Sequence, residues 1–229
     1  MPVYAEVHGT TLIRFPYTLG SMMEENPDTN FGPDPDLATV FPLTNTAIEL
    51  GYTLAPVLYL PEPPHDASQI ATQDANPTLV NGVWELGWTL RGLTPEETEA
   101  LKVTRKAAVM VLRDHHIADG MMFQGHPYQT RQQDRENVAG ASQLATLWLV
   151  NGGDPNTLRW ADPNQDFVWI DANNDLQPMS ASTVIAFGKA LAAFKSDCIF
   201  HALTLKQTID ACTTAEQVVA VDINAGWPT

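Results

Sequence analysis

Proline is concentrated in one part of this chain. Eleven of its 17 prolines lie in the first 93 of its 229 residues. Proline has no backbone N–H and disfavours helical geometry in the residue before it, so a proline-dense segment does not form long helices. The remaining residues contain long stretches without proline. The distribution predicts an α+β fold: a small, β-rich and loop-rich domain over 1–93, and a mainly helical domain with two short β-hairpins over 94–229.

Charge is distributed unevenly as well. The first 93 residues hold 11 acidic and two basic side chains, whereas the others hold 16 and ten, so the two parts carry −9 and −6 of the total of −15. An acidic surface repels phosphate, which argues against nucleic acid and anionic membranes as partners. No apolar run approaches the roughly 18 residues of a membrane span, and the first ten residues lack the layout of a signal peptide. No membrane insertion is expected.

Short alternating segments predict the β-structure of the first part. Strands are expected at 3–8, 11–16 and 53–60, and loops rich in turn-forming residues at 26–36 and 61–68. This acidic, proline-rich part is interpreted as a docking domain.

The segment 78–90 gives the clearest strand signal, because Asn81-Gly82 between two β-prone runs is a strong hairpin signature. Strict alternation would place Trp84 and Trp88 on one face of the second strand. Two interpretations stay open: this face is the inner face of a small sheet, or it is a contact surface for a partner or a glycan.

Two capping boxes predict helices in the second part. Thr94-x-x-Glu97, with proline at the first helical position, begins a helix that runs to about residue 118. The box at 130–133 begins a second helix that runs to about residue 150. The other expected elements are a hairpin over 120–130 with Gly125 at its turn, a hairpin over 159–179, a long helix from Ser180 to about Cys212, and a short helix from Thr214.

The long helix has apolar residues on more than one side, including Val184, Phe187, Phe194, Phe200 and Leu203. A helix that is apolar on several sides is packed on several sides. We expect it to be the central element, with the other two long helices against it; alternatively, other copies of the chain bury part of it. Cys198 and Cys212 would lie about 21 Å apart along its axis, too far for a disulfide.

Common catalytic and nucleotide-binding motifs are absent from the sequence. The runs 162–166 and 171–175 begin like calcium loops but lack the glycine and the acid that complete one, and Asp and Asn are common in turns. His115 and Asp119 have a spacing that a metal could use, although a histidine near a helix C-terminus more simply contacts the last carbonyls. We therefore predict no enzyme, no cofactor and no metal.

The densest polar segment is 128–137. Arg131 and Arg135 fall in the first turns of a helix, where the helix dipole disfavours cations. A network with Asp134, Glu136 and carbonyls of the preceding hairpin would offset this cost. A partner-binding patch is the alternative.

The runs FQGHPYQTRQQDRENVAGASQLA (123–145) and LRWADPNQDFVWIDANNDLQPMSASTVIAFGKALAA (158–193), with the closing AGWP, resemble a domain of unknown function of tailed-bacteriophage and prophage tail proteins. The resemblance covers about residues 100–228. In that family a hairpin leads into Gln-x-x-x-x-Asp-Arg-x-Asn, which here is Gln129, Asp134, Arg135 and Asn137, with Arg131 inside it. We interpret this motif as fixing the hairpin against the start of the second helix. Residues 82–97 also resemble a module at the joint of short tail-fibre and tail-fibre-assembly proteins.

The resemblance implies a structural component of the virion tail, made in the host bacterial cytoplasm: a tail fibre, tail tip or baseplate adaptor involved in tail assembly and host attachment. It implies other tail or baseplate proteins as partners. Because tails have threefold or sixfold symmetry, it also implies a homo-oligomer, a trimer or a ring. The main alternative is a tail-fibre assembly chaperone that is absent from the mature virion. A third hypothesis is an enzyme or glycan-binding module that uses Trp84 and Trp88.

Overall fold

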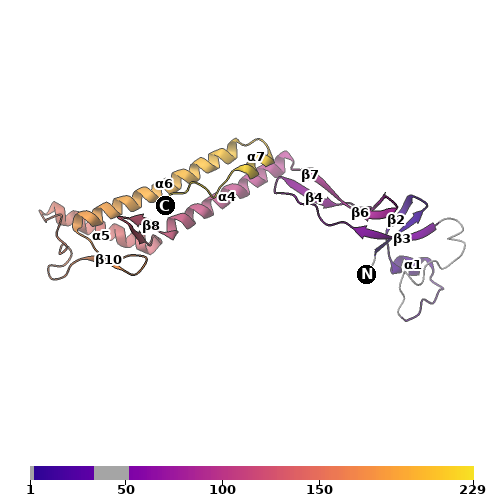
Figure 1. Ribbon diagram of the computed structural model, residues 1–229, viewed down its shortest axis with the longest axis horizontal. Helices are drawn as coiled ribbons and strands as arrows, with labels where there is room; N and C mark the ends of the chain where they lie inside the picture. The colour runs from indigo at the N-terminus through magenta and orange to yellow at the C-terminus, as the bar shows by residue number, and fades with distance from the viewer. Residues whose placement is uncertain (1–2, 34–51) are drawn as a thin grey trace. The chain divides into compact units, whose positions relative to one another are not determined.

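The computed structural model describes residues 3–33 and 52–229. The chain divides into two compact units, Met1–Leu93 (unit 1) and Thr94–Thr229 (unit 2), both visible in Figure 1. The division lies where the proline and charge distributions change. Both helices and strands are present, which confirms the α+β fold class.

Unit 1 contains a five-stranded sheet with the strand order β2-β1-β3-β6-β5. Its neighbouring strands are antiparallel except β3 and β6, which are parallel. The strands expected at 3–8, 11–16 and 53–60 are confirmed, and residues 61–68 form the expected loop. Of the loop expected at 26–36, residues 34–36 lie outside the described residues. The strands are β1 (Val3–His8), β2 (Thr11–Tyr17), β3 (Tyr52–Tyr59), β5 (Thr78–Val80) and β6 (Val83–Leu86).

The predicted hairpin at Asn81-Gly82 is confirmed. Both residues have positive φ, 49° and 84°, as a two-residue turn of this type requires. The expected continuation of the second strand to Leu90 is wrong, because the chain changes pairing partner at Gly87. The Gly87 carbonyl accepts a hydrogen bond from the backbone N–H of Asp74 (3.0 Å). The residues that follow belong to a separate two-stranded sheet, β4 (Gln69–Gln73) with β7 (Trp88–Gly92).

A short helix, α1 (Leu19–Glu25), was not expected in the proline-rich part. It occupies the proline-free interval between Pro16 and Pro27. Thr18 caps its start: the Thr18 side chain accepts from the Ser21 backbone N–H (3.1 Å), and the Ser21 hydroxyl accepts from the Thr18 N–H (3.4 Å). A seven-residue helix is too short to show a periodic pattern in the sequence, and its stability comes from tertiary contacts.

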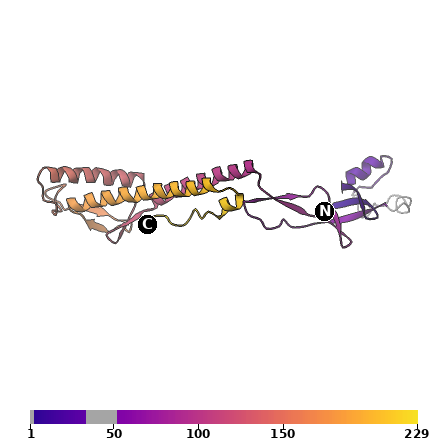
Figure 2. The same ribbon diagram turned by 90° about the horizontal axis from the view of Figure 1, so that it is seen from above.

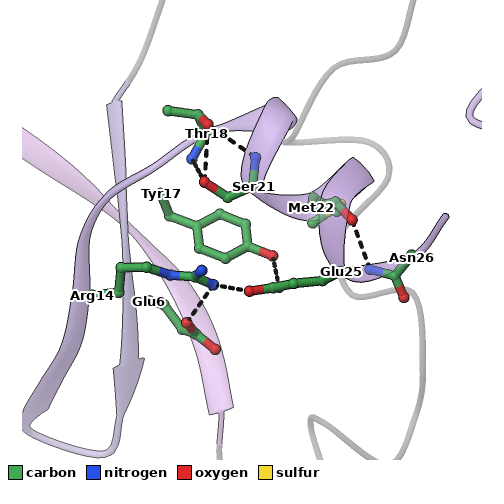
Figure 3. A network of polar contacts seen from close by, with 8 residues as sticks. All are labelled: Glu6, Arg14, Tyr17, Thr18, Ser21, Met22, Glu25 and Asn26. Atoms are coloured by element: carbon green, nitrogen blue, oxygen red, sulfur yellow. Dashed lines mark hydrogen bonds and ion pairs between the residues drawn. The ribbon is translucent and has the colours of Figure 1, made fainter.

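A polar network holds α1 against the sheet (Figure 3). The Arg14 guanidinium on β2 contacts both Glu6 (3.0 Å) and Glu25 (2.5 Å). It also lies over the Tyr17 ring, 4.6 Å from the ring centroid, and the Tyr17 hydroxyl donates to Glu25 (2.9 Å). One of the two bases of the first 93 residues therefore bridges a pair of carboxylates within unit 1.

The Tyr17 hydroxyl should titrate late. Burial, together with the hydrogen bond to the Glu25 carboxylate, raises the pKa of Tyr17 to about 12. A folded-state pKa above the unfolded value of about 10 contributes stability that is complete below pH 10 and is lost as the pH rises through 12. Alkaline titration of the tyrosinate absorbance should therefore show a late component, to which Tyr128 also contributes because burial raises its pKa; Tyr17→Phe should reduce this component and Glu25→Gln should move part of it to lower pH. A titration curve unchanged by both substitutions would contradict the described network.

Unit 2 is built from three long helices, α4 (Pro95–Asp119), α5 (Gln132–Val150) and α6 (Ala181–Ala211), and a short one, α7 (Ala215–Ala220). The hairpins are β8 (Met121–Phe123) with β9 (His126–Tyr128), and β10 (Val168–Ile170) with β11 (Leu176–Pro178). These elements confirm the expected helices and hairpins, with shorter strands in the second hairpin. The capping box at Thr94 is present, and Ser180 and Thr214 cap α6 and α7.

Helix α6 is the central element of unit 2, as predicted. Figures 1 and 2 show α5 alongside its N-terminal half and α4 alongside its C-terminal half. The Ser142 hydroxyl on α5 donates to the Val184 carbonyl (3.1 Å), and Lys106 on α4 pairs with Asp210 (2.5 Å). One stripe of α6 is buried: Val184, Phe187, Leu191, Phe194, Cys198, Ala202, Leu205 and Ile209.

Not every apolar side of α6 is packed within the chain. Phe194 is buried, but Phe200 is 63% exposed, and Ile199 and Leu203 are exposed as well. The expectation that this helix is covered on several sides by its own chain therefore holds only in part. The alternative, that other copies cover part of it, stays a prediction.

Cys198 in α6 and Cys212 at its C-cap are both free thiols, as their predicted separation along the helix indicated. Cys198 is buried, and burial raises the pKa of its thiol. The Cys212 thiol donates to the Thr208 carbonyl (3.3 Å). Both side chains thus serve packing and local hydrogen bonding.

Candidate interaction surface

The polar motif singled out in the sequence lies where β9 leads into α5. Arg131 is the N-cap residue of α5. Its Nε donates to the Asp134 carboxylate (2.9 Å), its backbone N–H donates to the same carboxylate (3.0 Å), and its guanidinium also contacts the Gln129 side chain. The Asp134 carboxylate lies in the first turn, where it compensates both the arginine and the helix dipole.

Thr130 does not cap this helix, so the predicted capping box at 130–133 is wrong by one residue. The Thr130 hydroxyl is buried and donates to the Ile117 carbonyl at the end of α4 (2.7 Å). The backbone carbonyl of Thr130 accepts from Arg135 (2.5 Å). Arg135 and Thr130 together link the start of α5 to the end of α4 across the β8–β9 hairpin.

Asn137, the last residue of the motif, lies one turn further along α5. Its side-chain oxygen accepts from Gln133 (3.2 Å), and Gln132 donates to Glu136 (3.0 Å). The structure thus brings Gln129, Arg131 and Asp134 into one contact network, and it places Asn137 in a separate exposed pair.

Sequence reasoning missed a groove between α5 and α6. It has a volume of about 570 Å³. Its floor contains the buried side chains of Val138 and Leu191 together with Gly188 and Ala192. A Cβ atom on Gly188 would lie 2.2 Å from the Ser142 hydroxyl oxygen, so a glycine is required for α5 and α6 to approach this closely.

Basic side chains line this groove and the hollow next to it. Arg135, Lys189 and Lys195 line the α5–α6 groove, which has no acidic lining residue. A second hollow, of about 490 Å³, shares Arg135 and Lys195 with the groove and adds Arg113 and Arg131. Five of the ten bases of unit 2 therefore surround two adjoining hollows in a chain of net charge −15.

Some of these basic side chains form ion pairs and others do not. Arg113 contacts Asp114 (2.6 Å), the one acid that lines the second hollow. Lys189 and Lys195 have no ion pair or hydrogen bond with another described residue. The segment AFGKALAAFK, two lysines among alanine, glycine and larger apolar residues, was the available sequence signal. It indicates a groove only once α5 is known to pack beside it.

The two tryptophans considered as a contact surface do not share an exposed face. Trp84 is 7% exposed and packs in the core of the unit 1 sheet. Trp88 follows the change of partner at Gly87, and its indole N–H donates to the Leu60 carbonyl (3.0 Å). The inner-face interpretation is therefore correct for Trp84, which is not available for stacking on a sugar.

The run 171–175 folds around a buried carboxylate. Asp171 is 3% exposed and accepts hydrogen bonds from the backbone N–H groups of Asn173 and Asp175 and from the Gln177 side chain. His126 of the first hairpin lies 3.5 Å away. Burial opposes ionisation, but these hydrogen bonds outweigh it and hold the pKa of Asp171 below its usual value. Asp171 thus organises the β10–β11 turn.

Asp171→Asn is expected to lower the Tm of the chain by several degrees at neutral pH, because an amide cannot accept all of these hydrogen bonds. A depressed folded-state pKa contributes stability that is present above the unfolded pKa of about 3.9 and is lost as the pH falls through the folded value. The difference from the wild type should therefore shrink in acid. Asp162→Asn is the matched control, since Asp162 is exposed and accepts from the Asn164 N–H. Equal effects of the two substitutions would contradict this assignment.

No group of three or more His, Cys, Asp or Glu side chains that could hold a metal ion occurs within residues 3–33 and 52–229. None of the helices described there is long and apolar enough to cross a lipid bilayer.

A protein-family model with the description "Domain of unknown function (DUF4376)" matches residues 100–225. The match includes the polar motif, the α5–α6 groove and the whole of α6. No curated protein and no solved structure matches the chain.

Proposed function

The chain belongs to the family described as Domain of unknown function (DUF4376), and we propose that it is a structural component of a bacteriophage tail. It would belong to the tail fibre, tail tip or baseplate, be made in the host bacterial cytoplasm, and contribute to tail assembly and host attachment. The resemblance of residues 123–145 and 158–193 to tail proteins supports this proposal.

The observation that carries the proposal is the apolar surface left exposed on the helices of unit 2. Isolated exposed apolar residues are ordinary, but contiguous ones mark interaction sites. On α6, Ile199, Phe200 and Leu203 lie within 1.1 turns of one another and are all exposed. The large exposed apolar side chains of the other two long helices are Val103, Val111, Leu144, Leu147 and Val150. Such a surface suits a protein that works in an assembly rather than alone.

Charge divides the roles of the two units in this proposal. Unit 1 carries 11 acidic and two basic side chains, and Arg14 is already paired with Glu6 and Glu25. An acidic domain associates readily with a basic surface of a neighbouring protein. Unit 1 therefore docks on another tail or baseplate protein, while α6 of unit 2 contacts other copies of the chain in a trimer or ring.

Mass spectrometry of purified particles, from a host that carries the genome encoding this chain, tests the proposal. The chain is expected in a fixed ratio to known tail proteins. A Phe200→Glu/Leu203→Glu variant should fold but enter particles poorly, whereas Gln207→Glu, an exposed change on the same helix, should enter normally. Absence of the wild-type chain from finished particles, with the chain bound to immature fibres, would instead establish a tail-fibre assembly chaperone.

A further inference from the structure

We infer that the α5–α6 groove and the adjoining basic hollow bind an acidic, amphipathic helix of a partner protein. The floor of the groove is apolar and its edges are basic, so the ligand must offer an apolar face flanked by carboxylates. The binding of such a helix is a separate inference from the proposed role in a phage tail and does not depend on that role.

The packing of α6 explains why a helix fits this position. α4 lies along the C-terminal half of α6, whereas the N-terminal half has α5 alone among the long helices described. The side chains of Ala139 and Ala192 are small and leave the groove open beside the close contact of α5 and α6 at Gly188. A third helix placed there would give this half of α6 a second helix neighbour, packed by ridges into grooves.

The length of the site defines the length of the ligand. The two hollows extend along α6 from Ile185 to Ile199, which at 1.5 Å per residue is about 21 Å. A helix of about 14 residues, four turns, covers that distance. Recognition of an amphipathic helix in such a groove uses apolar anchors at i, i+3 or i+4, and i+7.

The charges select the occupant. Lys189 and Lys195 have no partner among the described residues, and the two hollows together contain five basic lining side chains and one acidic one. A second copy of the chain fits this surface less well. Its most acidic helical stretch, the first turn of α4, is followed within two turns by Lys102, Arg105 and Lys106. A phosphate or polyanion would use the bases but leave the apolar floor uncovered.

A displayed peptide library provides the test. Each member is a 14-residue helix-forming peptide with leucines at i, i+3, i+7 and i+10, and with Glu or Lys at equal frequency at the remaining positions. Panning on the immobilised full chain should enrich peptides rich in Glu. The best peptide, labelled and titrated by fluorescence anisotropy, should bind Lys189→Glu/Lys195→Glu at least about tenfold more weakly than the wild type, and more weakly at high salt.

Two variants separate the groove from general charge effects. Ala192→Trp fills the groove without changing a charge and should also weaken binding by about tenfold, an effect of the size expected at the centre of an interface. Lys206→Glu changes a lysine of α6 outside both hollows and should leave binding nearly unchanged. Circular dichroism and thermal melts verify that each variant is folded.

The inference is overturned by any of three results. The first is an absence of enriched peptides, or enrichment of Lys-rich ones. The second is equal binding of the selected peptide to Ala192→Trp and to the wild type. That result would show that the peptide binds as a polyanion, through the basic side chains alone. The third is sedimentation showing that the wild-type chain oligomerises and Lys189→Glu/Lys195→Glu dissociates, which would place a second copy in the groove.

Discussion

Phe187→Ala is expected to lower the free energy of unfolding by about 3–5 kcal/mol, the range for removing a fully buried phenylalanine ring. Phe187 is 0% exposed, and its ring lies against those of Tyr128 (4.6 Å between centroids), Phe123 (5.1 Å) and Trp169 (5.7 Å). Phe123 and Tyr128 belong to the first hairpin and Trp169 to the second, so the substitution should loosen both hairpins as well as α6. Urea unfolding followed by tryptophan fluorescence measures the effect.

Phe200→Ala is the control for this experiment, because it removes the same ring from an exposed position of the same helix. Its cost should be below about 1 kcal/mol in the monomer. A loss of less than 1 kcal/mol for Phe187→Ala would mean that the aromatic cluster is not formed. A loss for Phe200→Ala as large as that for Phe187→Ala, at a protein concentration where copies associate, would indicate burial by another copy.

Trp227→Ala should have an effect of similar size, about 3–5 kcal/mol. Trp227 in the closing AGWP is buried and stacks on His116 of α4, with 4.8 Å between ring centroids and 13° between ring planes. His201 of α6 meets the same ring edge-on at 4.7 Å. The tryptophan thus joins the two helices through a segment that has no regular secondary structure of its own.

Trp227→Phe separates the two contributions of this residue. Phenylalanine keeps most of the ring but loses the indole N–H that donates to the Ile223 carbonyl (2.9 Å). It should cost about 1 kcal/mol for the hydrogen bond plus a smaller packing loss. A Tm of Trp227→Ala equal to that of the wild type would show that the C-terminal segment contributes nothing to unit 2.

Sequence patterns predicted the elements of unit 2 well, because each has a local signal. Thr94 with Glu97, Ser180 and Thr214 are caps whose hydrogen bonds form within one turn, and Gly125 at φ 83° provides the expected hairpin turn. Such signals depend on residues three or four apart and need no knowledge of the tertiary structure.

The errors arose where a distant contact decides. Thr130 would cap α5 by local rules, but the Ile117 carbonyl 13 residues earlier takes its hydroxyl. Gly87 ends one ladder because Asp74 pairs with it. α1 depends on Arg14 and Glu6 of the sheet. The α5–α6 groove has the same origin, since Lys189 and Lys195 define a site only after α5 and α6, separated by 30 residues of chain, have packed.

The arrangement of the helices around α6 also has a mechanical consequence. α6 has 31 residues, about 46 Å, and it is braced by α5 over one half and by α4 over the other. The two bracing helices meet near Lys195 and Ile199, where the end of α4 and the start of α5 line the same hollow. Of the helices described in unit 2, α6 alone is continuous across that point. If unit 2 bears a bending load, α6 should bend most near Lys195 and Ile199. A third helix bound along the groove would make this part of unit 2 stiffer.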